Sequence, residues 1–264
     1  MMASPLSLTG LHILVTRPEP NTTILCKLLQ DHGAHTYPWP TIDIRPIPFH
    51  DHPVLNDITP KTLCVFVSQS AVTHFFSGNN NHHSNISSAQ TMLRSNTVIA
   101  MGHGTAKRLQ KYGCKHVLCP KGHSNSEAVL AMPELQEVSN KHVVIIRAKE
   151  GRELIFNTLR QRGAKTAYLE VYQRLLPNKS TAPLLKRWQQ HPFDIVVTTS
   201  QEGLKNLCLQ LGKTTKQRLG QCRVSAMNKN MLLSLQDLGV EDIIELNSGS
   251  NAAILDTIIA YYKA

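Results

Sequence analysis

Hydroxyl groups and glycines recur where short apolar runs give way to polar, helix-forming segments. Such residues cap helices and leave backbone N–H groups free, and several of them at one edge of a sheet bind anions. The positions concerned are Ser68 and Ser70, Gly102 to Thr105, Ser124 and Ser126, and Thr198 to Ser200. Each one alone is explained as a helix cap. Together they predict an anion-binding rim.

The charge balance also favours an anionic ligand. The chain of 264 residues carries 28 Lys and Arg against 18 Asp and Glu, a net charge of +10, and such an excess attracts polyanions. The basic residues are spread singly and aromatic residues make up only 5%, which disfavours nucleic acid as the partner. A solvated basic surface without a ligand stays open as the alternative.

Metal and disulfide chemistry find little support. None of the six cysteines lies in a C-x-x-C pair, and no His/Cys cluster has zinc spacing, so we predict buried thiols and no metal site. The adjacent His82 and His83 fall in the polar stretch SGNNNHHSNISS, which is typical of a solvated loop.

An internal duplication organises these residues. Val98 to Leu109 reads VIAMGHGTAKRL, and 126 positions later Val224 to Leu235 reads VSAMNKNMLLSL. Val15-Thr16-Arg17 corresponds to Ile145-Ile146-Arg147 at an offset of 130, and Val67-Ser68-Gln69 to Thr199-Ser200-Gln201 at 132. Three segments in one order predict two copies of one fold, and a cleft between two lobes is a common ligand site.

Each copy has an α/β pattern. The predicted strands are apolar throughout, as in sheets covered by helices on both faces, and they alternate with helical stretches, which implies parallel sheets. Gly33, Gly113, Gly163 and Gly239 each follow a helical stretch, where a left-handed residue is expected. The predicted strands are 12–15, 63–67, 97–101, 142–146, 194–199 and 223–227; the helices are 21–30, 71–76, 105–111, 152–162 and 203–211, with one more ending before 239.

Two proline-bounded stretches correspond in the duplication and break this pattern. Residues 37–47 and 166–177 are predicted to be edge strands or connections between lobes that pair with each other. The predicted lobes are then 1–36 plus 178–264, and 48–165. No apolar run approaches the length of a membrane helix and the N-terminus lacks a signal-peptide pattern, so we expect a cytoplasmic protein without membrane contact.

A series of weak motifs runs in order over most of the chain. The motifs are VTRP at 15–18, FVSQSAV at 66–72, AMGHGTAKRLQKYG at 100–113, SEAVL at 126–130, IIRAKEGRELIFNTLRQRGA at 145–164, VYQR at 171–174 and TTSQEGL at 198–204. In the order and spacing of these motifs the chain resembles the uroporphyrinogen-III synthase family. The resemblance implies two similar lobes, each a parallel sheet flanked by helices, joined by a two-stranded β ladder.

The resemblance also implies a reaction. A lyase of this family closes the linear tetrapyrrole hydroxymethylbilane to uroporphyrinogen III, with inversion of ring D and loss of water, in haem biosynthesis. No cofactor is implied, nor a metal. The expected protein is a monomer with transient contact to the preceding pathway enzyme.

Site residues are carried over position by position. Tyr172 in VYQR is the candidate acid for departure of the hydroxyl, unless it only packs beside the ladder. The candidate substrate-binding residues are Arg17, Ser68, Ser70, Gly102, Thr105, Arg147, Arg152, Ser200, Arg223 and Asn230. Arginines pair with carboxylates, but the duplicated Arg17 and Arg147 have a shared structural role at the end of the first strand as their alternative.

The second copy departs from the family pattern. A G-x-x-T turn is expected in both copies, but here the second reads Asn228-Lys229-Asn230-Met231. Asn228 is expected to adopt a backbone geometry that suits glycine, since Asn tolerates positive φ. Asn230 is expected to replace the missing hydrogen bond, and Met231→Thr to leave activity equal or better.

Two other classes of function compete. A two-lobed cytoplasmic binding protein for a polyanionic small molecule would use the cleft without chemistry. A nucleotide-binding enzyme is the weaker alternative, because Gly102-His103-Gly104-Thr105 lacks the third glycine of a dinucleotide turn.

Overall fold

The apolar runs form the strands of two sheets in a computed structural model that describes residues 8–49, 51–77, 93 and 96–263. The chain divides into unit 1, Met1–Ile44 with Leu175–Ala264, and unit 2, Arg45–Arg174. The two divisions fall within the stretches 37–47 and 166–177, which the prolines single out. The expected loop around His82 and His83 lies outside the described residues.

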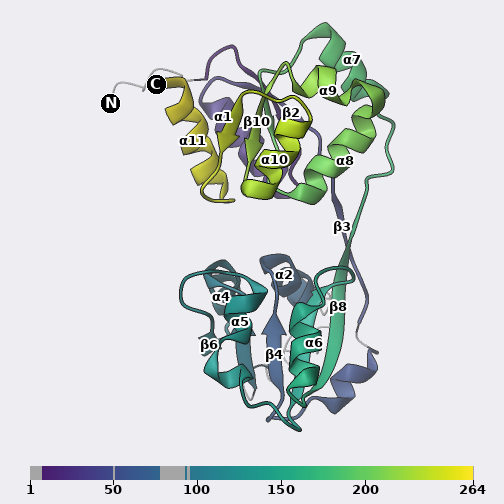
Figure 1. The fold of residues 1–264 in the computed structure, drawn as a ribbon, viewed down its shortest axis with the longest axis vertical. Coiled ribbons are helices and arrows are strands. Elements are labelled where there is room, and N and C mark those ends of the chain that lie inside the picture. The colour runs from purple at the N-terminus through teal and green to yellow at the C-terminus, as the bar shows by residue number, and fades with distance from the viewer. Residues whose placement is uncertain (1–7, 50, 78–92, 94–95, 264) are drawn as a thin grey trace. The chain divides into compact units, whose positions relative to one another are not determined.

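Unit 1 is built on a five-stranded parallel sheet (Figure 1). In spatial order its strands are β11 (Ile243–Glu245), β10 (Arg223–Ala226), β9 (Ile195–Val197), β1 (His12–Val15) and β2 (His35–Pro38). Its helices are α1 (Asn21–Asp31), α7 (Ala182–Gln190), α8 (Gln201–Leu211), α9 (Thr215–Leu219), α10 (Lys229–Asp237) and α11 (Asn251–Lys263), with a 3-10 turn at Gly212–Thr214.

Both faces of this sheet are covered by helices, and its middle strands are apolar: β9 throughout, and β1 from Ile13 to Val15. Ile13 and Val15 pack with side chains of α1 and α11 on one face. Leu14 points to the other face, where Leu184 and Trp188 of α7 join side chains of α8 and α10. Successive side chains of a strand face opposite sides, so an uninterrupted apolar run is what two helical layers require.

Unit 2 repeats the same arrangement. In spatial order its strands are β6 (Val117–Leu118), β5 (Thr97–Ala100), β4 (Leu63–Phe66), β7 (His142–Ala148), β8 (Lys165–Leu175) and β3 (Asp43–Pro46). Its helices are α2 (Gln69–Ser77), α4 (His103–Lys111), α5 (Ser126–Leu130) and α6 (Leu154–Gln161), with 3-10 turns at Pro53–Asp57 and Pro133–Leu135. α5 and α6 pack on one face of the sheet through Val129 and Leu159.

The two sheets confirm the duplication. The order β11-β10-β9-β1-β2 in unit 1 becomes β6-β5-β4-β7-β8 in unit 2. The three repeated segments align β10 with β5, β9 with β4 and β1 with β7, as this order requires. Gly33, Gly113, Gly163 and Gly239 all have positive φ, as expected of residues that end helices.

The first proline-bounded stretch supplies the edge strands β2 and β3. The second forms β8, which lies between β7 and β3, so the edge position predicted for it is wrong. β2 is the outer strand of unit 1, and β3 is the outer strand of unit 2 beside β8, where the Ile47 N–H donates to the Val171 carbonyl at 3.0 Å. Proline has no N–H to donate, so it is disfavoured in an inner strand, which is hydrogen-bonded to a neighbour on each side. A ladder that joins the two lobes remains a prediction.

Three histidines meet at the amino end of β1 in unit 1. The His12 ring stacks on His35 with centroids 4.9 Å apart and lies 5.8 Å from His191. Arg187 Nη2 lies 2.9 Å from His12 Nδ1, and a guanidinium can only donate, so this nitrogen carries no proton. Burial, followed by Arg187 and His35, lowers the pKa of His12, although Asp194 opposes the shift.

Candidate functional site

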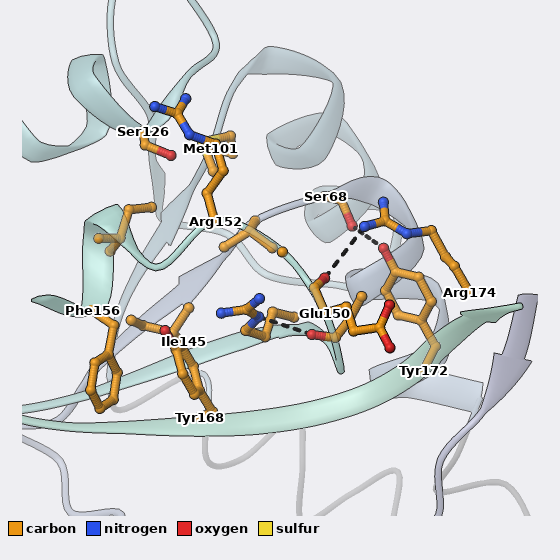
Figure 2. A pocket seen from close by; sticks show the side chains of 15 residues that line it. Ser68, Met101, Ser126, Ile145, Glu150, Arg152, Phe156, Tyr168, Tyr172 and Arg174 are labelled. Atoms are coloured by element: carbon orange, nitrogen blue, oxygen red, sulfur yellow. Dashed lines mark hydrogen bonds between the residues drawn. The ribbon is translucent and has the colours of Figure 1, made fainter. Parts of the chain in front are cut away.

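A pocket of about 220 Å³ opens in unit 2 where the order of the strands reverses. The chain runs outward from β4 to β5 and β6, then returns to β7 on the other side of β4, and ligands of open α/β sheets bind at such a switch point. Ser68 follows β4, Arg147 and Ala148 end β7, and Tyr172 lies on β8; all four line the pocket (Figure 2).

Ser68 and Tyr172 are hydrogen-bonded inside this pocket. The Ser68 hydroxyl lies 3.2 Å from the Tyr172 hydroxyl and accepts the Ala71 N–H at 3.0 Å. The Ala71 bond is the expected helix cap, at the start of α2. Because a hydroxyl offers two lone pairs and one proton, Ser68 can also donate to Tyr172. Tyr172 itself is 4% exposed, so its ring is held within the protein while its hydroxyl faces the pocket.

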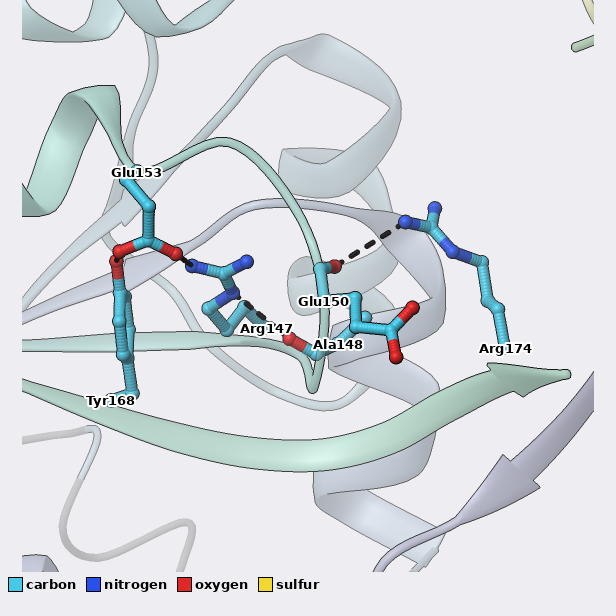
Figure 3. A network of polar contacts seen from close by, with 6 residues as sticks. All are labelled: Arg147, Ala148, Glu150, Glu153, Tyr168 and Arg174. Atoms are coloured by element: carbon cyan, nitrogen blue, oxygen red, sulfur yellow. Dashed lines mark hydrogen bonds and ion pairs between the residues drawn. The ribbon is translucent and has the colours of Figure 1, made fainter. Parts of the chain in front are cut away.

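Arg147 is the buried cation of the pocket, and its partners belong to the protein (Figure 3). Its Nε donates to the Ala148 carbonyl at 2.9 Å, and Nη1 donates to Glu153 Oε1 at 3.1 Å. Its guanidinium lies 4.4 Å from the centroid of the Tyr168 ring, whose hydroxyl donates to Glu153 at 2.6 Å. This network supports the structural alternative for Arg147, although the side chain still lines the pocket.

The network shifts the ionisation of two of its members. The hydrogen bond from Tyr168, then the one from Arg147, lowers the pKa of Glu153 even though burial opposes it. Burial, followed by the bond to Glu153, raises the pKa of Tyr168. At neutral pH the set is therefore a phenol, a carboxylate and a guanidinium, and it carries no net charge.

Arg152 lies at the exposed rim of the same pocket. Its Nη2 is 2.7 Å from Glu127 Oε1 in the first turn of α5, with side chains 65% and 54% exposed. This hydrogen bond is the main reason that the pKa of Glu127 is lowered. Exposed ion pairs contribute little to stability, so a substrate carboxylate can exchange with Glu127 at small cost. Ser126, which also lines the pocket, is buried.

The other predicted residues of unit 2 stand in the first turns of two helices. Ser70 lies at the start of α2, and Gly102 caps α4 with Thr105 buried in its first turn. Gly102 has φ −175°, an extended conformation open to any residue. A Cβ there would lie 1.9 Å from the Ser124 Oγ, so the glycine provides space. A Cβ on Gly104 would meet only the end of the flexible Gln69 side chain, at 2.7 Å, so the space requirement explains Gly102 without a nucleotide.

In unit 1 the equivalent strand ends carry Arg17 and Ser200. Ser200 accepts the Gly203 N–H at 3.0 Å and caps α8, as Ser68 caps α2. Arg17 is 8% exposed and binds Asn251 through Nη1 and the Gly249 carbonyl through Nη2, the latter at 2.7 Å. Arg17 thus ties the end of β1 to the start of α11, which also supports its structural alternative.

The expectations for the turn at Asn228 are wrong in their geometry. Asn228 has φ −163°, and its side chain caps α10 by accepting the Met231 N–H at 3.0 Å. No glycine-like backbone is needed, and the cap comes from Asn228 while Asn230 is exposed. Met231 is fully buried in the core with Leu235 and Val224, so a threonine there would remove core packing.

Arg223 lies at the opposite edge of its sheet from these residues. It is the first residue of β10, whereas Asn228 and Ser200 follow the carboxyl ends of β10 and β9. Arg223 pairs with Asp242 at 2.9 Å and lies over the Tyr262 ring at 5.2 Å. The structure therefore does not bring Arg223 to the rim formed by the helix starts.

In the part of the chain that the structure describes, His, Cys, Asp and Glu side chains do not gather in groups of three that could hold a metal ion. None of the helices there has the length and apolar content to cross a membrane.

Comparison with known proteins decides the family. The family model described as uroporphyrinogen-III synthase HemD matches residues 25–254. The chain is 31% identical over 248 residues to the uroporphyrinogen-III synthase of Escherichia coli (strain K12), covering 92% of this chain and 98% of that protein. The chain belongs to the uroporphyrinogen-III synthase family. It is also 29% identical over 248 residues to the Salmonella typhimurium synthase, with the same coverage of both chains.

Solved structures of the synthase family share the fold. A mutant uroporphyrinogen III synthase from the extremely thermophilic bacterium Thermus thermophilus matches with a TM-score of 0.66 at 14% identity, covering 97% of this chain and 100% of that one. The uroporphyrinogen-III synthetase of Helicobacter pylori 26695 matches with a TM-score of 0.60 at 18% identity, covering 95% and 99%. At these identities the likeness concerns the two-lobed α/β fold alone.

Some pocket residues of this synthase family member were not singled out by sequence reasoning. Glu150, Gly151, Tyr168 and Arg174 line the pocket, and Arg174 donates to the Glu150 carbonyl at 3.3 Å. Arg174 stands in the VYQR motif and could have been found there. Tyr168 pairs in regular register with Ile145. Glu150 and Gly151 follow the end of β7, where the register shifts between Arg147 and Ala148, and such a shift re-aims side chains in ways that a residue pattern does not predict.

Proposed function

We propose that this protein is a uroporphyrinogen-III synthase that closes hydroxymethylbilane with inversion of ring D and loss of water. The observation that carries the proposal is the family match over residues 25–254, supported by a pocket at the switch point of unit 2. We also expect a monomer in the cytoplasm, with transient contact to the enzyme that supplies the substrate.

The chemistry needs an acid more than a nucleophile. Departure of the terminal hydroxyl leaves an electron-poor azafulvene, which an already substituted ring carbon attacks to give a spiro intermediate that fragments and recloses. In our proposal the Tyr172 phenol donates its proton to the departing hydroxyl. Ser68 already accepts the Ala71 N–H, so its own proton is available for the Tyr172 oxygen, which leaves the phenol proton free for the substrate.

The rest of the rate enhancement comes from holding the linear substrate in place. Unassisted closure gives the unturned isomer, so the protein must bring the two reacting carbons together, an effect that supplies several kcal/mol. The substrate carries acetate and propionate groups, and Arg152 and the capped starts of α2 and α4 are the groups we assign to them in unit 2. Arg17 and Ser200 are the corresponding candidates in unit 1, while Arg223 is the weakest of the set.

The decisive experiment is incubation with freshly made hydroxymethylbilane, followed by isomer analysis of the oxidised porphyrin. We expect the type III isomer in excess over the type I isomer of a protein-free control. A product that is type I alone would refute the synthase and favour a protein that only binds the polyanion. Tyr172→Phe should then lower turnover and leave folding intact, and unchanged turnover would remove Tyr172 from the mechanism.

A further inference from the structure

One aromatic contact of Tyr172 lies outside the pocket and is not used by the mechanism above. The ring of His74, on α2, stacks on the Tyr172 ring with centroids 5.2 Å apart and 25° between the planes. His74 is half-buried, and in the described part of the chain it does not belong to the residues that line the pocket. It therefore reaches the pocket only through Tyr172.

The contact has the geometry of a support. Tyr172 is fixed at its hydroxyl by Ser68, the cap of α2, and along its ring by His74 of the same helix. A hydrogen bond at the tip leaves the ring plane free to turn about the bond from Cβ, whereas a stacked ring restricts that rotation. The two contacts together define both the position of the phenol oxygen and the plane in which its proton lies.

The imidazole is suited to this task because it stays neutral. Burial lowers the pKa of His74, so near neutral pH the ring packs on the phenol as an uncharged flat surface. Among the described residues, His74 is the aromatic side chain whose ring packs on the ring of Tyr172. Helix α2 is thus placed to orient one side chain of β8 from two points.

We propose that His74 is a positioning residue for Tyr172, holding the phenol in the plane from which it protonates the leaving hydroxyl. This inference rests on the proposed function. A misplaced general acid stabilises the transition state less and does not change the binding of the substrate in its ground state. We therefore expect kcat to fall while KM stays the same. Small misplacements of reacting groups are costly, and we expect His74→Ala to lower kcat by about tenfold.

The test is a double-mutant cycle in the full-length protein with hydroxymethylbilane as substrate. His74→Ala should lower kcat in the wild-type background and have no further effect in the Tyr172→Phe background, because it acts through the lost hydroxyl. His74→Phe, which keeps a flat neutral ring, should restore kcat. Thr73→Ala, on the same helix and bonded to the Gln69 carbonyl, is the matched control and should behave as wild type.

Each outcome decides between the ideas. Wild-type kcat in His74→Ala, or an equal loss in both backgrounds, would overturn the positioning role while the synthase stands. A wild-type protein that makes no type III isomer would instead overturn the proposed function. If His74→Ala does not fold, as judged by its circular dichroism, His74→Leu keeps the volume without the flat ring and takes its place in the cycle.

Discussion

Replacing Gly102 by alanine tests how the start of α4 is packed. The Cβ would lie 1.9 Å from Ser124 Oγ, 2.4 Å from Ser124 Cβ and 3.3 Å from Ser124 Cα. Ordinary van der Waals contact begins near 3.4 Å, so the Cβ of Ser124 must move back by about 1 Å. Rotation of the hydroxyl cannot relieve this, because the Cβ position is fixed by the backbone of its loop.

The expected cost follows from overpacking alone. Gly102 has an extended backbone with φ −175°, so alanine adds no strain in φ. Inserting a methyl group into a packed site costs about 1–3 kcal/mol, and we expect the free energy of unfolding of Gly102→Ala to fall by that amount. Urea denaturation, followed by circular dichroism with the slope of the transition compared between variants, measures the change.

Two substitutions of Ser124 make the test specific. Ser124→Gly removes both Cβ and Oγ, so the double variant with Gly102→Ala should recover most of the lost stability. Ser124→Ala keeps the Cβ at the clash and should recover much less. The reasoning would be refuted by a Gly102→Ala protein as stable as wild type, or by equal recovery from both Ser124 variants.

Three further predictions concern stability, acid and salt. Met231→Thr should lower the free energy of unfolding by about 2–4 kcal/mol, because it empties part of the core and buries a hydroxyl; an unchanged urea midpoint would contradict this. The pKa of His12 in the folded protein lies below its ordinary value of 6.5, so His12 stabilises the fold above pH 6.5, and this contribution is lost as the pH falls through the lower folded pKa. Unfolding measured from pH 8 to 5 should therefore show a shallower loss in His12→Asn, and parallel curves would disprove the role of His12. With a net charge of +10, added salt should raise the KM for the polyanionic substrate, and a KM independent of salt would rule out electrostatic capture.

Much of the fold is predictable because burial on two faces leaves a strong signal. Strand β1, for example, is predicted at residues 12–15 and occupies His12–Val15. The ends of helices are less certain: the sequence predicts a helix from Arg152, but α6 begins at Leu154. The two residues before it belong to the loop that carries Arg152 to its ion pair with Glu127, and helix propensity alone does not register such a tertiary contact.

The partners of the site residues could not be predicted in the same way. The repeat aligns Arg17 with Arg147, yet one binds the Gly249 carbonyl and the other binds Glu153. These bonds join segments that are distant in sequence for Arg17 and near for Arg147. A residue pattern gives the side chain and its strand end, but its partner depends on the loops that pack around it.

The two copies show which features the fold itself demands. The strand order is the same in both units, and Gly113 and Gly239 both have positive φ, the conformation in which a glycine commonly ends a helix. Gly102 and Asn228 occupy equivalent positions, and both have an extended backbone that any residue can adopt. Local packing therefore decides the residue type: Ser124 leaves no room for a side chain at Gly102, while Asn228 has room for a side chain that caps its helix. Where backbone geometry does not restrict the residue type, the two copies have been free to take different side chains, and these are the positions at which a shared scaffold acquires an asymmetric site.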